Sequence, residues 1–248
     1  MRHDPDLAAQ AGRERLAARL HGLEGAALLR AALAAPEPVA LVSSFGAESA
    51  ALLHMVAEID PATPVLFLET GMLFPETLAY QRDLAGMLGL RDLRLIRPEP
   101  RALAVGDPDG RLHARDHDAC CALRKTEPLR AALRPFAGWI TGRKRGQTTL
   151  RARLRPVEAD AQGLVKLNPL ADWDAGQLRA YMAAHDLPPH PLVAEGFPSI
   201  GCAPCTTPVA PGEHPRAGRW RGAGREECGI HIENGVVSRG AAAPLDAA

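Results

Sequence analysis

The sequence is poor in aromatic residues and in lysine, and its formal net charge is zero. Phe, Trp and Tyr make up 4% of the 248 residues, and the only lysines are Lys125, Lys144 and Lys166. Because basic and acidic residues both number 29, the composition gives no sign of a general attraction to nucleic acid or anionic lipid. Most cationic positions carry the planar guanidinium that suits oxyanions, although a codon bias would give the same ratio.

Long hydrophobic runs are also missing. No stretch of about 18 apolar residues occurs, and the start, Met1 to Pro5, contains no apolar region of a signal peptide. We therefore expect a cytoplasmic protein with no membrane partner and no nucleic-acid partner. In that compartment five cysteines argue for metal or redox chemistry over structural disulfides.

What is present is an alternation of apolar strands and helices. Residues 7–35 predict one or two amphipathic helices packed outside a sheet, and Pro36 ends them. Strands are predicted at residues 39–42, 65–68, 93–96, 139–142 and around Val165, and helices at 48–59, 75–88, 120–133 and 173–185, the last capped by Asp172. Residues 97–118 are predicted to be a loop. This order indicates an α/β fold with a doubly wound parallel sheet and a ligand at the carboxyl ends of its strands.

Four cysteines form a pattern of two pairs, Cys120-Cys121 and Cys202-Ala203-Pro204-Cys205. The pairs are 80 residues apart, so they meet only if the fold joins two distant segments. Four thiolates suit a four-iron cluster or a structural zinc, and an adjacent pair fits a zinc knuckle poorly. Reduced core cysteines and redox pairs remain as alternatives.

Polar and basic loops follow the predicted strands. Ser44, Phe45 and Gly46 precede a helix, where backbone N–H groups bind phosphate, and the loop is weakly similar to the Ser-Gly-Gly-x-Asp-Ser loop of ATP pyrophosphatases. Residues 143–151 carry Arg145 and Arg151, which suit phosphate or sulfate. The alternatives are an ordinary strand-to-helix turn and a solvated basic loop.

The fifth cysteine, Cys228, stands beside His231 in a tail rich in glycine and arginine. A nucleophilic cysteine needs a lowered pKa, which nearby cations supply. Arg225 is such a cation, whereas Glu226 and Glu227 oppose it. These residues alone leave Cys228 either catalytic or incidental.

Six motifs appear in one order between residues 39 and 231. They are Ser44-Phe45-Gly46, Glu69-Thr70-Gly71-Met72-Leu73-Phe74-Pro75-Glu76-Thr77, Cys120-Cys121 with Arg124-Lys125, Trp139-Ile140-Thr141-Gly142 with Arg145 and Gln147, Gly201-Cys202-Ala203-Pro204-Cys205-Thr206, and Glu227-Cys228-Gly229-Ile230-His231. Together they resemble the assimilatory adenylyl-sulfate reductases, the cluster-containing branch of the phosphoadenylyl/adenylyl-sulfate reductase family.

That resemblance implies a fold of the adenine-nucleotide α-hydrolase type and one [4Fe-4S] cluster on Cys120, Cys121, Cys202 and Cys205. It implies thioredoxin-dependent reduction of adenylyl sulfate to sulfite and AMP, in sulfate assimilation and cysteine biosynthesis. The Cys228 thiolate would attack sulfur, leaving an S-sulfocysteine that thioredoxin, a separate protein, resolves.

The resemblance also implies roles for the remaining residues. The expected substrate-binding residues are Ser44, Phe45, Gly46, Glu69, Thr70, Gly71, Lys125, Arg145, Arg151, Arg216, Arg219 and His231. Lys125 is expected to lie between cluster and substrate, since it follows Cys121 by about one helical turn. His231 is expected to contact substrate oxygens or to help ionise Cys228.

The predicted organisation has four parts: a helical extension (1–36), a nucleotide- and cluster-binding α/β domain (37–206), a mobile catalytic tail (207–237) and a disordered end (238–248). The sequence does not determine whether the chain forms a homo-oligomer. Two other functions compete: a reductase that prefers phosphoadenylyl sulfate or accepts both nucleotides, and a non-catalytic metal-containing regulator that binds adenine nucleotides.

Overall fold

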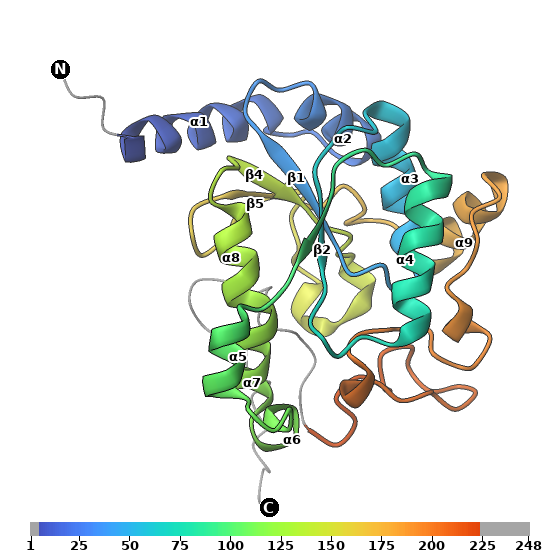
Figure 1. Ribbon diagram of the computed structural model, residues 1–248. Coiled ribbons are helices and arrows are strands. Elements are labelled where there is room, and N and C mark those ends of the chain that lie inside the picture. The colour runs from blue at the N-terminus through green and yellow to red at the C-terminus, as the bar shows by residue number, and fades with distance from the viewer. Residues whose placement is uncertain (1–4, 224–248) are drawn as a thin grey trace, which may run out of the picture.

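The computed structural model of the chain describes residues 5–223 and shows a sheet covered by helices on both faces (Figure 1). The strand order is β3-β2-β1-β4-β6-β5. Cys228, His231 and the predicted end at residues 238–248 lie outside the described residues. Between residues 5 and 223, no helix is long and apolar enough to cross a membrane.

Five of the six strands run parallel, as predicted. They are β1 (Val39–Ser43), β2 (Val65–Leu68), β3 (Leu93–Ile96), β4 (Gly138–Ile140) and β6 (Val165–Leu167). The sixth, β5 (Val157–Ala159), is an antiparallel edge strand paired with β6. The sequence did not predict β5, because its three residues are partly exposed and form no apolar run.

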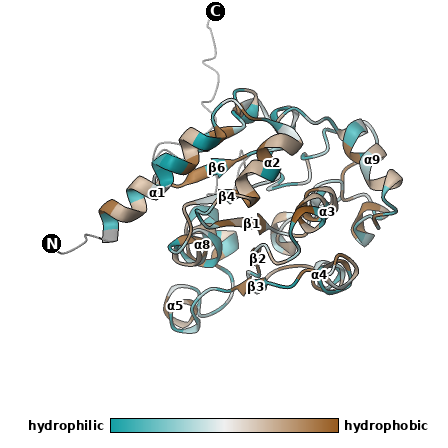
Figure 2. Ribbon diagram, turned by 90° about the horizontal axis from the view of Figure 1, so that it is seen from above, coloured by the Kyte–Doolittle hydropathy of each residue, from teal (hydrophilic) through white to brown (hydrophobic). Residues whose placement is uncertain are grey.

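Helices cover both faces because alternate residues of the central strands point to opposite sides. Val39 and Leu41 pack in a core with α1 (Pro5–Leu20), α2 (Gly25–Leu33), α3 (Ser49–Ile59), α4 (Pro75–Met87) and α9 (Ala175–Ala184). Ala40 and Val42 pack in a second core with α8 (Glu127–Leu133). Figure 2 shows α8 and α4 on opposite sides of the sheet. The predicted α/β fold is therefore confirmed.

The N-terminal helices share the first of these cores. Leu16, Leu20 and Leu28, which recur at helical spacing in the sequence, are fully buried there. A Cβ at Gly138 would stand 3.0 Å from a methyl of Leu16, so α1 packs closely on β4. The helical extension and the sheet are thus joined by apolar packing.

The prediction of a loop over residues 97–118 is wrong. This stretch contains α5 (Pro100–Gly106), α6 (Leu112–Arg115) and the start of α7 (His117–Cys121). The aspartates that indicated a loop hold these short helices, because Asp116 accepts hydrogen bonds from two N–H groups of α7 and Asp107 accepts one from the Leu112 N–H. No residue of α5 or α6 is buried, so the sequence of these helices shows no apolar pattern.

The predicted cap of the last helix is also wrong by two residues. Asp174, not Asp172, accepts the N–H of Gln177 at 2.7 Å and forms a capping box with that residue. Asp172 instead forms an ion pair with Arg145. The helix therefore begins at Ala175.

The helix predicted over residues 120–133 is present, but it is not a regular α-helix. A π-turn, η1 (Ala122–Thr126), stands between α7 and α8. Its hydrogen bonds run over five residues instead of four, and such turns are frequent at functional sites. The turn lies directly after Cys120 and Cys121.

Candidate active site

A cavity of about 380 Å³ opens at the carboxyl ends of β1, β2 and β4. This is the place that the parallel sheet predicts for a ligand. Its wall is built by the loop after β1, by Thr70 after β2, by Lys125, by residues 198–202, and by parts of residues 142–151 and 214–220. Segments far apart in the sequence therefore meet around one hollow.

In the loop after β1, Ser44 and Gly46 line the cavity, whereas Phe45 does not. The Phe45 ring is fully buried and packs edge-on against Phe67, with ring centroids 5.2 Å apart. Its φ is +49°, a left-handed conformation that costs a non-glycine residue about 1–2 kcal/mol. Ring burial offsets that cost, so Phe45 anchors the loop from below instead of facing the cavity.

In the loop after β2, only Thr70 of the three predicted residues lines the cavity. The Glu69 carboxylate accepts the Gly71 N–H at 2.7 Å and the Arg97 Nε–H at 2.8 Å. Gly71 has φ +72°, and a Cβ there would lie 3.3 Å from Nη1 of Arg124. Glu69 and Gly71 thus shape the turn that presents Thr70.

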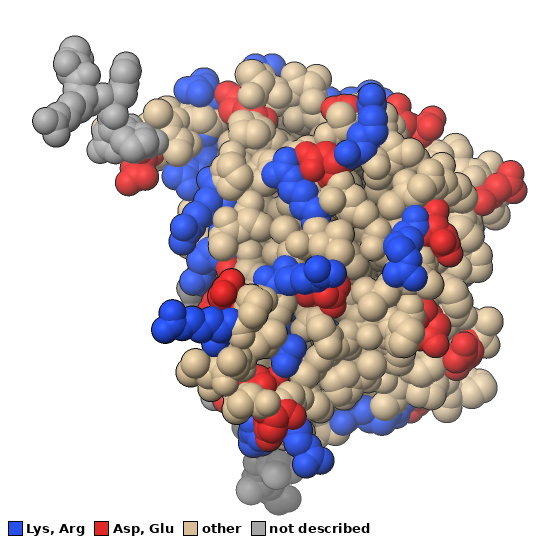
Figure 3. Space-filling model, in the orientation of Figure 1, with Lys and Arg blue, Asp and Glu red and all other residues tan. Residues whose placement is uncertain are grey.

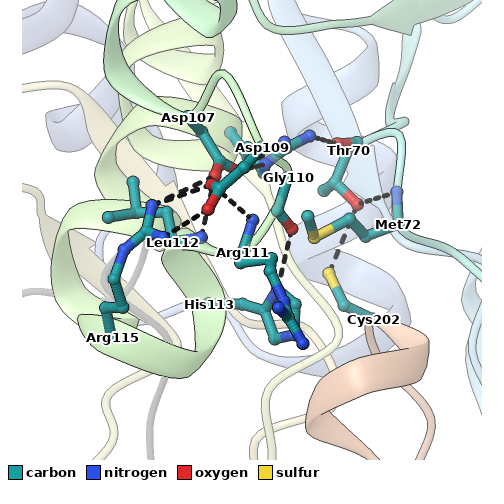
Figure 4. Close-up of polar contacts among 11 residues, drawn as sticks. Thr70, Met72, Asp107, Asp109, Gly110, Arg111, Leu112, His113, Arg115 and Cys202 are labelled. Carbon is teal, nitrogen blue, oxygen red and sulfur yellow. Dashed lines mark hydrogen bonds and ion pairs between the residues drawn. The ribbon is translucent and has the colours of Figure 1, made fainter.

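The two cysteine pairs meet beside this turn. Thr70 Oγ1 lies 3.3 Å from Sγ of Cys202, and the Ala203 N–H donates to the Met72 carbonyl at 2.8 Å. Thr70, Met72 and Cys202 lie together in Figure 4. Burial raises the pKa of Cys120 to about 11; the positive charge of Arg124 opposes this shift, and negative charge on Cys202 and Cys205 adds to it. The fold therefore joins two segments that are 80 residues apart in the sequence.

All four cysteines of this site are thiols, three of them buried and Cys205 half-buried. Among residues 5–223, no three His, Cys, Asp or Glu side chains converge closely enough for one metal ion. Each iron of a [4Fe-4S] cluster takes one thiolate, so its four sulfurs need not converge on one point. The donor set fits such a cluster in its chemistry.

Arg124 links this site to the helices before it. Its buried guanidinium donates to Asp107 at 2.6 and 3.2 Å and to the Thr70 carbonyl at 2.9 Å. Burial by itself would raise the pKa of Asp107, but hydrogen bonds from Arg124 and from the Leu112 N–H hold it below its usual value. Sequence reasoning gave Asp107 and Arg124 no role, and the Arg124-Lys125 pair after the cysteines was the available signal.

Lys125, the next residue in the π-turn, lines the cavity with Cys202. The side chains of Arg124 and Lys125 therefore serve different sites: Arg124 binds Asp107 and the Thr70 loop, and Lys125 faces the hollow. The expected place of Lys125 between the cysteines and a bound substrate stays a prediction.

Of the predicted arginines, Arg151, Arg216 and Arg219 line the cavity, but Arg145 does not. The Arg145 guanidinium donates to the Leu154 carbonyl at 2.8 Å and pairs with Asp172. Sequence reasoning missed other polar side chains of the wall, among them Glu48, Arg143, Lys144, Gln147 and His214. On the face shown in Figure 3, basic and acidic residues are interspersed, so this face gives no sign of an anionic ligand. The cations of the cavity wall do.

Part of the predicted mobile tail, residues 207–223, is a closed loop. The Thr207 N–H donates to the Gly218 carbonyl at 2.9 Å, and the Trp220 N–H donates to the Cys205 carbonyl at 3.0 Å. Two guanidinium nitrogens of Arg221 donate to the Glu213 carboxylate, both at 2.9 Å. The loop carries Arg216 and Arg219 into the cavity from the cysteine side.

Arg219 is held on two sides within this loop. Its Nη1 donates to the Ile200 carbonyl at 3.1 Å, and its guanidinium stacks 4.4 Å from the Trp220 ring centroid. A Cβ at Gly201 would overlap that guanidinium, so only glycine leaves room for it.

Comparison with known proteins now gives this site a family. Residues 38–208 match the family described as the phosphoadenosine phosphosulfate reductase domain. The chain belongs to this family. It is 52% identical over 202 residues to adenosine 5′-phosphosulfate reductase of Mesorhizobium japonicum, covering 82% of this chain and 79% of that protein.

The relatives are named for two different substrates. The chain is 50% identical to adenosine 5′-phosphosulfate reductase of Chelativorans sp., with 78% of this chain and 79% of the relative covered. It is 45% identical to phosphoadenosine 5′-phosphosulfate reductase of Gloeobacter violaceus, with 79% and 83% covered. The family match makes the chain a reductase of activated sulfate, and hence an oxidoreductase.

Solved structures agree with the family. The phosphoadenylyl-sulfate reductase of Candida auris, in a phosphate complex, superposes with a TM-score of 0.66 at 25% identity and covers 79% of this chain and 96% of that one. Yeast FAD synthetase reaches 0.52 at 15% identity, covering 82% and 75%, and shares the fold alone.

Proposed function

We propose that this family member reduces adenylyl sulfate to sulfite and AMP, with thioredoxin as a separate electron donor, in sulfate assimilation and cysteine biosynthesis. The observation that supports it most is the cavity at the strand ends, where the polar loop after β1, the C-x-x-C segment and six lysine and arginine side chains share one wall. Two relatives at 52% and 50% identity carry the name adenosine 5′-phosphosulfate reductase.

The proposed chemistry is a pair of thiol displacements. The Cys228 thiolate forms a bond to the sulfur of adenylyl sulfate, and the bond from that sulfur to the bridging oxygen breaks, so AMP leaves with the electron pair. A thioredoxin thiolate then attacks Sγ of the S-sulfocysteine and sulfite leaves. The second thioredoxin thiol releases Cys228, so the dithiol supplies both electrons.

The cavity cations have a defined task in this scheme. Departure of AMP places negative charge on the phosphate, and Lys125, Arg151, Arg216 and Arg219 line the space where those oxygens would lie. Because these groups are fixed by the loops around them, they need little reorganisation when the charge develops. Ser44 and Gly46 supply the polar loop after β1.

One [4Fe-4S] cluster on Cys120, Cys121, Cys202 and Cys205 belongs to the proposal. When bound, it supplies a fixed electrostatic environment beside Lys125 and not the reducing electrons. Anaerobically purified protein should then be brown and contain about four irons per chain. Colourless protein with stoichiometric zinc would reject the cluster.

The deciding experiment is mass spectrometry after incubation with adenylyl sulfate and no thioredoxin. We expect one added sulfonate on Cys228, absent from the Cys228→Ser variant and removed by reduced thioredoxin. An unmodified Cys228 under conditions that support turnover would reject the mechanism.

A second candidate is a reductase that prefers phosphoadenylyl sulfate or accepts both nucleotides. It is favoured by the 45% identical relative named for that substrate. Comparing kcat/KM for the two nucleotides decides between them. The non-catalytic regulator would bind AMP but form no sulfite with either nucleotide.

A further inference from the structure

One cation of the cavity wall is already neutralised by an acid of the same wall. Lys144 Nζ lies 2.6 Å from Oε2 of Glu48, and both residues line the cavity. The Lys144 side chain is only 5% exposed, whereas that of Glu48 is 38% exposed. The lysine is therefore fixed in the wall, and its partner reaches solvent.

The same carboxylate oxygen has a second donor. Nε2 of Gln147 lies 3.2 Å from Oε2 of Glu48, and the Gln147 carbonyl oxygen accepts the Lys144 N–H at 3.1 Å and a hydrogen bond from Arg151. One oxygen of Glu48 thus has two donors, an ammonium and an amide N–H. A phosphate or sulfate oxygen has the charge and acceptor capacity to take the same two donors.

Other cations in this loop form ion pairs with acids that do not line the cavity. Arg143 pairs with Glu158, and Arg145 pairs with Asp172. These pairs hold the loop without affecting what enters the cavity. Glu48 differs from Glu158 and Asp172 because its negative charge stands within the cavity wall.

The charges around Lys144 explain why a counter-ion is needed there. Burial lowers the pKa of Lys144, Glu48 opposes that shift, and the positive charges of Arg151 and Arg216 lower it further. Several cations therefore lie close enough to repel one another before any ligand binds. A buried charge without a partner is strongly destabilising, so the acid stabilises the wall that the ligand will use.

We propose that Glu48 is a resident counter-ion, whose carboxylate holds the Lys144 and Gln147 donors until the oxyanion of the ligand displaces it into solvent. The inference rests on the proposed function, since it takes an anionic nucleotide as the ligand of the cavity. Displacement of one anion by another keeps Lys144 neutralised in both states. It also weakens the binding of AMP, which favours release of the product.

Isothermal titration calorimetry with AMP, and separately with inorganic sulfate, tests this on the full-length protein. We expect Glu48→Gln to lower the Kd of both probes about tenfold in low salt, because the competing charge is gone while the side-chain shape stays. The gain should shrink at about 1 M salt, where charges are screened. An unchanged or higher Kd in Glu48→Gln would overturn the proposal.

Asp172→Asn is the matched control. It removes one carboxylate from a cation of the same loop, but Asp172 does not line the cavity. We expect its Kd for AMP to equal that of the unmodified protein. An equal gain in both variants would overturn the proposal, because it would show only the effect of net charge.

A second measurement uses the unmodified protein, in case Glu48→Gln does not fold. Carbodiimide coupling of an amine to exposed carboxylates, read by mass spectrometry, should label Glu48 more when AMP is present. Unchanged or lower labelling would overturn displacement. If neither AMP nor sulfate binds the unmodified protein, both this inference and the proposed function fail. Binding as expected without sulfite formation would reject only the reductase.

Discussion

Thr70 and Cys202 are 132 residues apart in the sequence, yet the Thr70 hydroxyl lies 3.3 Å from the Cys202 sulfur. Thr70 lies in the turn that follows β2, and Cys202 opens the C-x-x-C segment. This contact joins the loop after β2 to the cysteine side of the cavity. It also makes the geometry of the cysteine site depend on a loop of the sheet.

Thr70→Ala should therefore weaken the cysteine site. The change removes the hydroxyl contact to Cys202 and the acceptor of the Met72 N–H. This loss should lower the free energy of unfolding by about 1–2 kcal/mol. We expect a lower Tm and lower iron content after anaerobic purification. Thr70→Ser keeps the hydroxyl and should retain iron; equal losses in both variants would show that the hydroxyl is not the cause.

Lys125→Ala should retain iron and lose most activity. The side chain lines the cavity beside Cys202, so its removal takes positive charge from the substrate without removing a thiol. Steady-state sulfite formation and iron content are the two readouts. Arg130→Ala, at an exposed position on α8, serves as the control and should match the unmodified protein. Unchanged turnover in Lys125→Ala would reject its role.

Arg216 and Arg145 were both predicted to bind substrate, but only Arg216 lines the cavity. Arg216→Ala should raise KM for adenylyl sulfate about tenfold, since the guanidinium lines the cavity. Arg145→Ala should leave KM within about twofold and lower the Tm, because its partners are Asp172 and the Leu154 carbonyl. The reverse order of KM effects would contradict the placement of these side chains.

His190 should make stability depend on pH. Its buried ring accepts the Leu192 N–H at 3.2 Å and bonds Thr77 Oγ1 at 3.0 Å, and burial lowers its pKa from 6.5 to about 4. The unfolded chain therefore binds more protons between these values. The contribution to stability is fully present above about pH 6.5 and is lost as the pH falls toward 4.

Thermal unfolding measured from pH 8 to pH 4 checks this prediction. We expect Tm to fall through the acid range, and His190→Gln to show a smaller fall from a lower starting Tm. An identical pH profile in the two proteins would assign the dependence to other groups.

Much of the fold was predictable because the strands carry their own signal. Val65–Leu68 is a continuous apolar run, and it is fully buried as β2. The exposed helices α5 and α6 have no such pattern, since their stability comes from aspartate hydrogen bonds that the sequence does not distinguish from loop chemistry. Edge strand β5 was missed because its three residues also form no apolar run.

The residue types of the candidate site were predictable from the sequence, but the directions in which the side chains point were not. Arg145 and Arg151 belong to one basic loop, yet two short 3-10 turns, η2 (Arg145–Gln147) and η3 (Thr149–Arg151), direct only the second into the cavity. Glu48 stands where the similar Ser-Gly-Gly-x-Asp-Ser loop has its aspartate, so an acid at this position led to no separate prediction. Its meaning depends on Lys144, which is 96 residues away.

The π-turn at Ala122–Thr126 sets a limit on how this site could be rebuilt. On one side of it Cys120 and Cys121 face the cysteine site, and on the other Leu129 and Leu133 face the core. Deleting Ala122 would restore a regular α-helix and rotate one half against the other by about 100°. The cysteine pair therefore could not be transplanted onto an uninterrupted helix, because either the thiols or the leucines would then point the wrong way.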